Sequence, residues 1–222
     1  MIITIDGPAG TGKSTVAQLV AHALGFDFLD TGAMYRAVGL AALRRHTNLE
    51  DQRELAFVAR SCKIVFDFTR HPPTVLLNGE PVNHLLRAGD ATRAASFVAQ
   101  VPAVRELLVR QQQEIGAGRE NLVTEGRDQG TVVFPHADLK FYLDATPAER
   151  ARRRADQLRA RGETVDALAL QRQIMERDSR DASRAVGPLS VPPDAQVIDT
   201  TKLTEQQVVD RIVDQVLSLQ KK

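Results

Sequence analysis

The sequence has a single cysteine, Cys62, among its 222 residues. One thiol cannot form an intrachain disulfide, and it cannot assemble a zinc site of cysteine thiolates from this chain alone. A run of about 18 apolar residues, the length that crosses a membrane as a helix, is also missing. Asp6 interrupts the first apolar run after only a few residues. We therefore expect a soluble protein of the reducing cytoplasm that carries no export signal.

An excess of one charge is absent as well. Twenty-nine Lys and Arg residues stand against 28 Asp and Glu residues, so the formal net charge is only +1. This balance provides no global field that would draw the chain to nucleic acid or to a membrane surface. Hydrophobic residues make up 43% of the sequence, which is enough for one full core. We expect a single domain in which any anion-binding groups are clustered locally.

The clearest motif is GPAGTGKS, residues 7–14, which matches the P-loop pattern G-x-x-x-x-G-K-[ST]. A short β-branched segment, residues 2–5, precedes it as a predicted strand, and residues 13–24 follow at helical spacing before Gly25. The backbone N–H groups of such a loop close around phosphate oxygens at the helix N-terminus. The predicted ATP site comprises Gly7, Pro8, Ala9, Gly10, Thr11, Gly12, Lys13, Ser14 and Thr15.

Two side chains of the P-loop have predicted chemical roles. Lys13 is expected to reach the β- and γ-phosphates of ATP, and Ser14 to hold Mg²⁺ through its hydroxyl. Asp30 and Glu125 are both candidates for orienting water bound to that metal, and the sequence does not rank them. The loop thus identifies the donor of a phosphoryl group and leaves the acceptor open.

Strand-like and helical segments alternate along the chain, which favours an α/β fold with a parallel sheet. Strand-like segments at 64–68, 74–77 and 81–82, with the tight-turn pair Asn78-Gly79, predict a small antiparallel insert. Further strands are expected at 26–29, 122–124, 140–143 and 196–198. Further helices are expected at 34–43, at 93–115 with a break at Pro102, from Pro147 after the N-cap Thr146, at 166–183, and after Thr204. The last helix is expected to bury Val208, Val209, Ile212, Val213, Val216 and Leu217.

Charged side chains far from the P-loop are candidates for the acceptor site. Arg177, Asp181 and Arg184 are spaced at i, i+4 and i+7 of a predicted helix, so two cations would flank a carboxylate on one face. Arg127 and Asp128 follow an apolar strand, and ligands of open parallel sheets bind beyond the carboxyl ends of strands. The helix face is equally compatible with a surface ion-pair ladder, and spacing alone does not decide between them.

Four segments together resemble the bacterial cytidylate kinases, the (d)CMP kinases of the nucleoside monophosphate kinase family. They are ITIDGPAGTGKS (3–14), LDTGAMYR (29–36), EGRDQGTVVFP (125–135) and ERDSRDASRAV (176–186), and the match extends over nearly the whole chain. The resemblance implies a three-layer α/β/α P-loop fold and transfer of the γ-phosphoryl group of ATP to CMP or dCMP, with Mg²⁺. It also implies a monomer, and the composition adds the expectation of a cytoplasmic protein that binds neither nucleic acid nor membrane.

The resemblance further divides the chain into a core, a monophosphate-binding region and a lid. The core comprises about residues 1–30, 119–146 and 185–222, and the monophosphate-binding region, which contains the antiparallel insert, about 31–118. The lid is a helical segment of about residues 147–166. Within it, Arg150 and Arg154 are the candidates for catalytic contacts with the transferring phosphate, although Arg152, Arg153, Arg159 and Arg161 are equally basic.

The same resemblance assigns residues to the CMP site. They are Thr31, Tyr35, Arg36, Ser96, Arg105, Arg127, Asp128, Arg177, Asp181 and Arg184. A carboxylate such as Asp128 would accept a hydrogen bond from the amino group of cytosine and repel the carbonyl group of uracil. Ser96 and Arg105 would serve the remaining ring edge, and Asp181 the sugar hydroxyls. The acceptor phosphate would be held by Arg36 and by the catalytic residues Arg127, Arg177 and Arg184.

Two other interpretations remain open on the sequence. A different small P-loop kinase would act on AMP, UMP, GMP or an acceptor such as shikimate, but a purine kinase would not need the pattern of Ser96, Arg105 and Asp128. A catalytically inactive P-loop module would bind ATP to report energy status or to hold a partner. The intact Lys13 and Ser14 argue against such a module.

Overall fold

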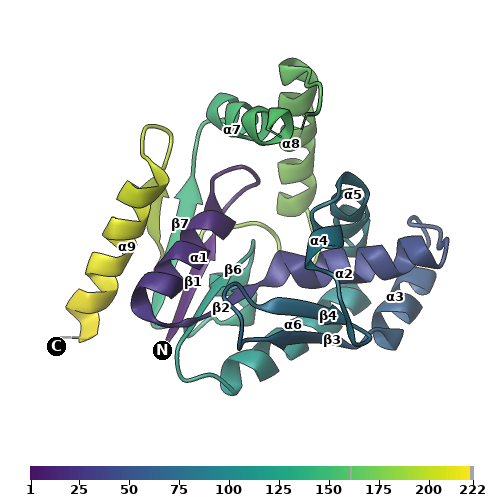
Figure 1. Cartoon of the computed structure of the whole chain (residues 1–222), viewed down its shortest axis with the longest axis horizontal. Coiled ribbons are helices and arrows are strands. Elements are labelled where there is room, and N and C mark those ends of the chain that lie inside the picture. Colours follow the sequence, from purple (N-terminus) through teal and green to yellow (C-terminus); the bar gives the residue numbers. More distant parts are fainter. Residues whose placement is uncertain (161, 221–222) are drawn as a thin grey trace.

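A computed structural model describes residues 1–160 and 162–220. Its centre is a five-stranded parallel sheet flanked by helices (Figure 1). From edge to edge, the strands are β2 (Asp27–Asp30), β6 (Leu122–Glu125), β1 (Ile2–Asp6), β7 (Leu139–Asp144) and β8 (Gln196–Asp199). All four neighbouring pairs are parallel, which confirms the predicted α/β class.

Strand β1 lies at the centre of this sheet although it is the first element of the chain. It pairs with β6 on one side and with β7 on the other, and its residues Ile3 and Ile5 are fully buried. Short β-branched strands of this kind suit the middle of a parallel sheet, where both faces are covered. The carboxyl end of β1 therefore brings the P-loop to the middle of the sheet edge.

The two faces of the sheet belong to two hydrophobic clusters. On one face, α1 (Lys13–Leu24) and α9 (Glu205–Gln220) pack with strand residues such as Val123. On the other face, Leu122 belongs to a cluster formed mainly by residues 31–118. Neighbouring residues of a strand point to opposite faces, which explains this division. The stripe predicted for α9 is correct at Val208, Val209, Ile212 and Val216, and Val213 is partly buried, but Leu217 is 42% exposed.

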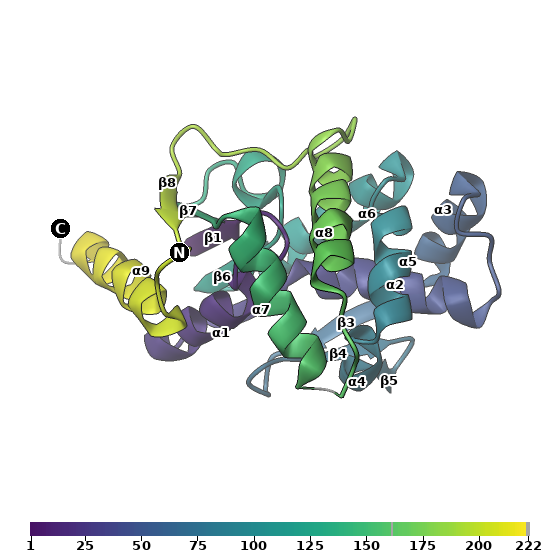
Figure 2. The same cartoon turned by 90° about the horizontal axis from the view of Figure 1, so that it is seen from above.

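Residues 31–118 lie beside the sheet and contain most of the remaining elements (Figure 2). The helices are α2 (Thr31–Arg44), α3 (Gln52–Ser61), α4 (Asn83–Leu86), α5 (Gly89–Val98) and α6 (Pro102–Ala117). The predicted antiparallel insert is confirmed as β3 (Ile64–Asp67), β4 (Thr74–Leu77) and β5 (Glu80–Pro81). Helix α2 begins at Thr31, three residues earlier than predicted, because the Asp30 carboxylate caps it by accepting from Ala33 N.

Helices α7 (Pro147–Arg159) and α8 (Ala167–Ala182) lie above the carboxyl ends of the strands in Figure 1. Thr146 caps α7 by accepting from Glu149 N, as the sequence predicted. Asp166, near which the second helix was expected to begin, caps α8 by accepting from Leu168 N and Ala169 N. Arg161, one of the basic residues of the predicted lid, lies outside the described residues. In the two described ranges, no helix combines the length and the apolar character needed to cross a membrane.

Candidate active site

The P-loop, residues 7–14, joins β1 to α1 and depends on its glycines. Gly7 and Gly10 have φ values of +145° and +85°, a region that residues with a side chain rarely adopt. A Cβ atom at Gly7 would collide with the backbone of Leu143, and one at Gly10 would press against Arg150. Close approach of β7 and α7 therefore requires glycine at both positions.

Lys13 is buried in the loop that it belongs to. Its Nζ donates hydrogen bonds to Pro8 O at 2.7 Å and to Thr11 Oγ1 at 3.4 Å. Burial, and next the positive charge of Arg127, lower the pKa of Lys13 to about 7. The ammonium group is thus short of negative partners, and the phosphates of a nucleotide would supply them.

The hydroxyl of Ser14 donates a hydrogen bond of 2.7 Å to Glu125 Oε1, at the end of the neighbouring strand β6. Burial, and then Asp30, raise the pKa of Glu125. The Asp30 carboxylate, in contrast, caps α2 and forms an ion pair of 2.6 Å with Arg36. The sequence left these two carboxylates unranked, and the structure places Glu125 against Ser14.

The donor set at Ser14 fits Mg²⁺. Among the described residues, no group of three or more His, Cys, Asp or Glu side chains forms an all-protein metal site. Mg²⁺ bound with a nucleotide needs no such group, because waters and phosphate oxygens fill most of its coordination positions. The oxygens of Ser14 and Glu125 are the hard ligands that this ion prefers.

Asp6, the last residue of β1, links the P-loop to the segment that carries Arg127 and Asp128. Its carboxylate accepts hydrogen bonds from Gln129 N at 2.9 Å and from Gly130 N at 2.7 Å, at the start of the π-helical turn η1 (Gln129–Val133). Burial raises the pKa of Asp6 to about 7. The sequence reasoning gave Asp6 no role, and only the pairing of distant segments reveals it.

Three of the four predicted phosphate-binding arginines, Arg127, Arg177 and Arg184, lie around Asp181 at the end of α8. Asp181 is almost fully buried and forms ion pairs with Arg127, at 3.1 Å from its Nε, and with Arg184. The prediction that Arg184 lies on the helix face is wrong, because α8 ends at Ala182. Arg184 follows the C-cap Ser183 and turns back onto Asp181.

Positive charge exceeds negative charge around this carboxylate. The four arginines of the cluster are Arg36, Arg127, Arg177 and Arg184, and two carboxylates, Asp30 and Asp181, pair with them. Burial, followed by repulsion from Arg127, lowers the pKa of Arg177 to about 10. A half-buried cluster with surplus cations is a site for a multiply charged anion.

A second ion pair lies at the other end of the acceptor site, where Arg105 on α6 meets Asp128. Both side chains are buried, with 2% and 5% exposed. The guanidinium of Arg105 also lies over the ring of Tyr35, 5.4 Å from its centroid. Gly187 packs so closely on the pair that a Cβ atom there would collide with both residues. Gly187 was missed in the sequence because its role depends on this contact.

Several buried polar atoms of the acceptor site have no hydrogen-bond partner. Buried polar groups almost always have one, so each exception calls for an explanation. Of the nine such atoms in the described part of the chain, five belong to predicted CMP-binding residues: Tyr35 Oη, Arg36 Nε, Ser96 Oγ, Arg105 Nε and Arg184 Nε. A bound polar ligand would account for this concentration. Thr31, by contrast, is already bonded to Glu125 O at 2.7 Å.

The two predicted lid residues differ in their surroundings. Arg150 is buried and donates to Ala145 O and to Ala9 O, both at 3.1 Å, and pairs with Asp178 of α8. Arg154 is half-buried and donates to Gln157 Oε1 at 3.3 Å within its own helix. The structure therefore places Arg150 directly against the P-loop.

Comparison with known proteins agrees with this geometry. A family model described as cytidylate kinase matches residues 3–218. A cytidylate kinase from Caldanaerobacter subterraneus is 46% identical, covering 96% of this chain and 93% of that protein. One from Pelotomaculum thermopropionicum is 46% identical, covering 96% and 95%. Among solved structures, a gluconokinase from Sinorhizobium meliloti has a TM-score of 0.51 at 14% identity, covering 98% and 91%, a likeness of fold alone.

Proposed function

The chain belongs to the cytidylate kinase family, and from this membership we infer that it transfers the γ-phosphoryl group of ATP to CMP or dCMP, giving ADP and the nucleoside diphosphate. The observation that carries the inference is the acceptor site. Five unpartnered polar atoms and a surplus of arginine charge converge there, within reach of an intact P-loop.

On the donor side, we assign the nucleotide to the P-loop. Its backbone N–H groups and Lys13 bind the phosphates of ATP, with residues 7–15 forming the site. Ser14 and Glu125 would hold a Mg²⁺ ion, which supplies positive charge to the phosphates when it is bound. Arg150 lies against Ala9, and with Arg154 it adds positive charge from the side of α7.

On the acceptor side, the phosphate and the base of CMP occupy opposite ends of the site. Arg36, Arg127, Arg177 and Arg184 orient the phosphate for in-line attack, and Asp181 accepts from the sugar hydroxyls. Asp128 accepts from the amino group of cytosine, with Arg105 fixing its orientation. Thr31, Tyr35 and Ser96 complete the pocket. Residues 31–118 and 147–166 close over the two nucleotides and exclude water.

The remaining expectations concern the state of the protein in the cell. The cytoplasmic location and the monomeric state that the resemblance implies stay predictions. So does the division of the chain into a core, a monophosphate-binding region and a lid.

A coupled assay of ADP release over CMP, dCMP, UMP, AMP, GMP and shikimate tests the function. CMP and dCMP should give the highest rates, because only cytosine offers an amino donor to Asp128 at this edge of a pyrimidine ring. A different preferred acceptor would indicate another P-loop kinase. No ADP above background with any of the six would favour the inactive module.

The variant Asp128→Asn tests the assignment of the base. The amide offers a donor to uracil as well as an acceptor to cytosine, so the preference for CMP over UMP in kcat/KM should fall by about 10- to 100-fold. The KM for ATP should change little. Asp90→Asn is a matched control, because Asp90 forms only an exposed ion pair with Arg93. Unchanged selectivity in a folded Asp128→Asn protein would remove Asp128 from base recognition.

A further inference from the structure

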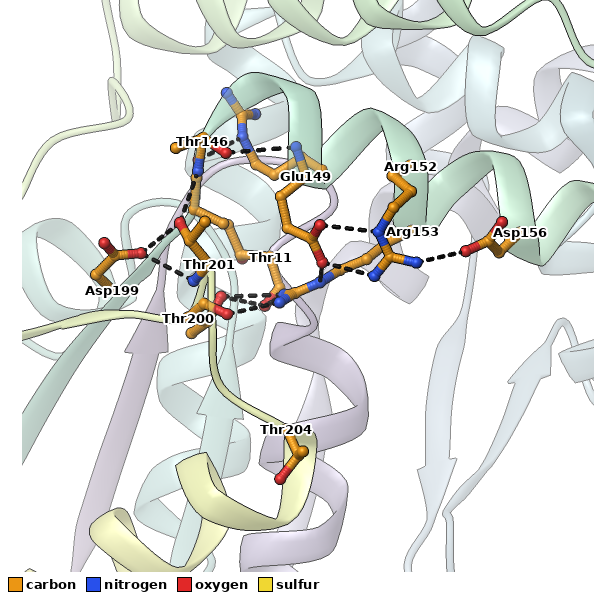
Figure 3. A network of polar contacts seen from close by, with 12 residues as sticks. Thr11, Thr146, Glu149, Arg152, Arg153, Asp156, Asp199, Thr200, Thr201 and Thr204 are labelled. Carbon is orange, nitrogen blue, oxygen red and sulfur yellow. Dashed lines mark hydrogen bonds and ion pairs between the residues drawn. The ribbon is translucent and has the colours of Figure 1, made fainter.

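Arg153 lies where three parts of the molecule meet: α7, the P-loop and the turn between β8 and α9 (Figure 3). Its Nε donates to Glu149 Oε1 at 2.8 Å, within α7. Its Nη2 donates to Thr200 O at 2.6 Å, and its Nη1 to Thr200 Oγ1 at 3.0 Å and to Thr11 O at 3.4 Å. One guanidinium thus connects three segments that are distant in the sequence.

Thr200 contacts the same carbonyl from the other side. It is 1% exposed, and its single hydroxyl proton can be donated to Thr11 O at 3.4 Å or to Asp144 O at 3.0 Å. The backbone N–H of Thr200 donates to Asp144 O as well, at 2.8 Å, which fixes the residue at the end of β7. The carbonyl oxygen of Thr11 therefore faces donors from residues 142 and 189 positions away.

The position of this carbonyl controls a neighbouring donor. A peptide group is planar and trans, so the carbonyl of Thr11 and the N–H of Gly12 point in opposite directions. Holding the Thr11 carbonyl toward Arg153 and Thr200 therefore directs the Gly12 N–H to the opposite side of the loop. P-loop N–H groups bind phosphate from that side.

Among the described residues, the donors to the Thr11 carbonyl are Arg153 and Thr200, whereas the Thr11 hydroxyl is bonded to Pro8 O and Lys13 Nζ. Gly12 has a φ of +88°, and a Cβ atom placed there would meet nothing within 4 Å. Glycine has more backbone freedom than any other residue, so rotation of the peptide before it is opposed by little packing. The hydrogen bonds to Thr11 O add to the restraint that the Thr11 side chain provides.

We propose that Arg153 is a positioning residue for ATP: through the Thr11 carbonyl, it orients the Gly12 peptide so that its N–H group faces the phosphates. The proposal deepens the kinase function proposed above and concerns its donor site alone. It also separates Arg153 from the neighbouring arginines of α7, which the sequence could not distinguish.

The adjacent Arg152 is a matched control. It lies on the same helix and donates to the same Glu149, at 2.7 and 2.8 Å. It also donates to Asp156, and its side chain is 61% exposed. Hydrogen bonds from Arg152, and then from Arg153, lower the pKa of Glu149 to about 2. Glu149 thus keeps one arginine partner in either single variant.

The test compares Arg153→Gln with Arg152→Gln in the full-length protein. We expect Arg153→Gln to raise the KM for ATP about tenfold, the effect of losing one hydrogen bond in the donor site. Its KM for CMP should stay within about twofold of the wild type. The Kd of inorganic tripolyphosphate, measured by calorimetry, should rise by the same factor as that of ATP. Arg152→Gln should leave all three constants unchanged, and Arg153→Lys should recover part of the loss.

Thr200→Val keeps the proposal testable if Arg153→Gln folds poorly. Because its hydroxyl acts on the same carbonyl, Thr200→Val should weaken ATP and tripolyphosphate binding in parallel. The double variant should be no weaker than Arg153→Gln alone.

Three results would overturn the proposal. The first is an unchanged affinity of Arg153→Gln for tripolyphosphate, which would mean that Arg153 contacts the nucleoside. The second is an equal rise in the KM values for ATP and CMP, which would mean a general loss of structure. The third is full additivity of Arg153→Gln and Thr200→Val, which would mean that the two residues do not act through the same carbonyl. The tripolyphosphate measurement does not depend on the acceptor. A wild-type protein that fails to phosphorylate CMP would therefore contradict the proposed function without affecting this test.

Discussion

The two halves of the active site differ in how completely the protein satisfies its own polar groups. In the donor half, Lys13 is bonded to Pro8 O and Ser14 to Glu125, and side chains from α7 and α8 hold the backbone of Ala9. In the acceptor half, five buried polar atoms have no partner and the arginine charge is only partly compensated. The donor half is preorganised by the fold, whereas the acceptor half is incomplete until a ligand supplies the missing oxygens.

The largest expected effect breaks the chemistry of the donor half. Lys13→Met should lower kcat by roughly 10³-fold, because the positive charge that stabilises the moving phosphoryl group is lost. The KM for CMP should be unchanged, since the acceptor half does not depend on this lysine. Steady-state kinetics with both substrates varied measures both values. Lys63→Met, at an exposed position, is the control, and a kcat within tenfold of the wild type would deny Lys13 this role.

A smaller effect is expected on the acceptor side, where function and stability should change in opposite directions. Arg177→Gln should lower kcat/KM for CMP by roughly 10²-fold through loss of a phosphate contact. It should also raise the free energy of unfolding of the ligand-free protein by about 1 kcal/mol, because a half-buried cation repelled by Arg127 is removed.

The signs of the Arg177 prediction follow from its pKa. A cation whose pKa is lower in the folded than in the unfolded protein destabilises the fold at every pH below the folded value, here about 10. Urea unfolding at pH 7 measures the gain in stability. Arg180→Gln, at an exposed position of the same helix, serves as the control for both assays. A loss of stability in Arg177→Gln would show that its charge is well compensated without ligand.

The smallest expected effect is a proton taken up when ATP binds. Burial lowers the pKa of Lys13 to about 7 in the ligand-free protein, and phosphate should raise it again. At pH 8 the lysine is then mostly neutral before ATP binds and charged afterwards, so binding takes up close to one proton. Because protons favour the bound state, the affinity for ATP should fall as the pH rises above 7. The change is at most tenfold in Kd per pH unit.

Calorimetry at pH 8 in two buffers of different ionisation enthalpy measures this proton. The same titration with Lys13→Met separates the contribution of the lysine from that of Glu125, whose pKa is also raised. Equal proton uptake in the wild type and in Lys13→Met would assign the proton to another group.

What the sequence could predict depended on whether the contacts of an element are local or distant along the chain. The P-loop, the capped start of α7 and the turn at Asn78 and Gly79 were correct because each depends on residues within a few positions. Helix α3 was not predicted. The start of α2 was missed because Asp30-Thr31-Gly32 has the composition of a loop, whereas the Asp30 cap makes it the first turn of a helix.

Contacts across the sheet lay beyond the sequence for a physical reason. Glu125 meets Ser14 only because β6 lies beside β1, and Asp6 meets η1 for the same reason. Family resemblance identified the acceptor residues, but it did not indicate which of them form ion pairs with one another. In particular, the placement of Arg184 required knowing that α8 ends at Ala182.

The central position of β1 has a consequence for synthesis on the ribosome. The strand that leads into the P-loop emerges first, but both of its neighbours, β6 and β7, lie beyond residue 120. Thr200, which faces the Thr11 carbonyl, emerges later still. Because such long-range pairing cannot form until its partners exist, the P-loop has no finished sheet behind it until β6 and β7 have been synthesised.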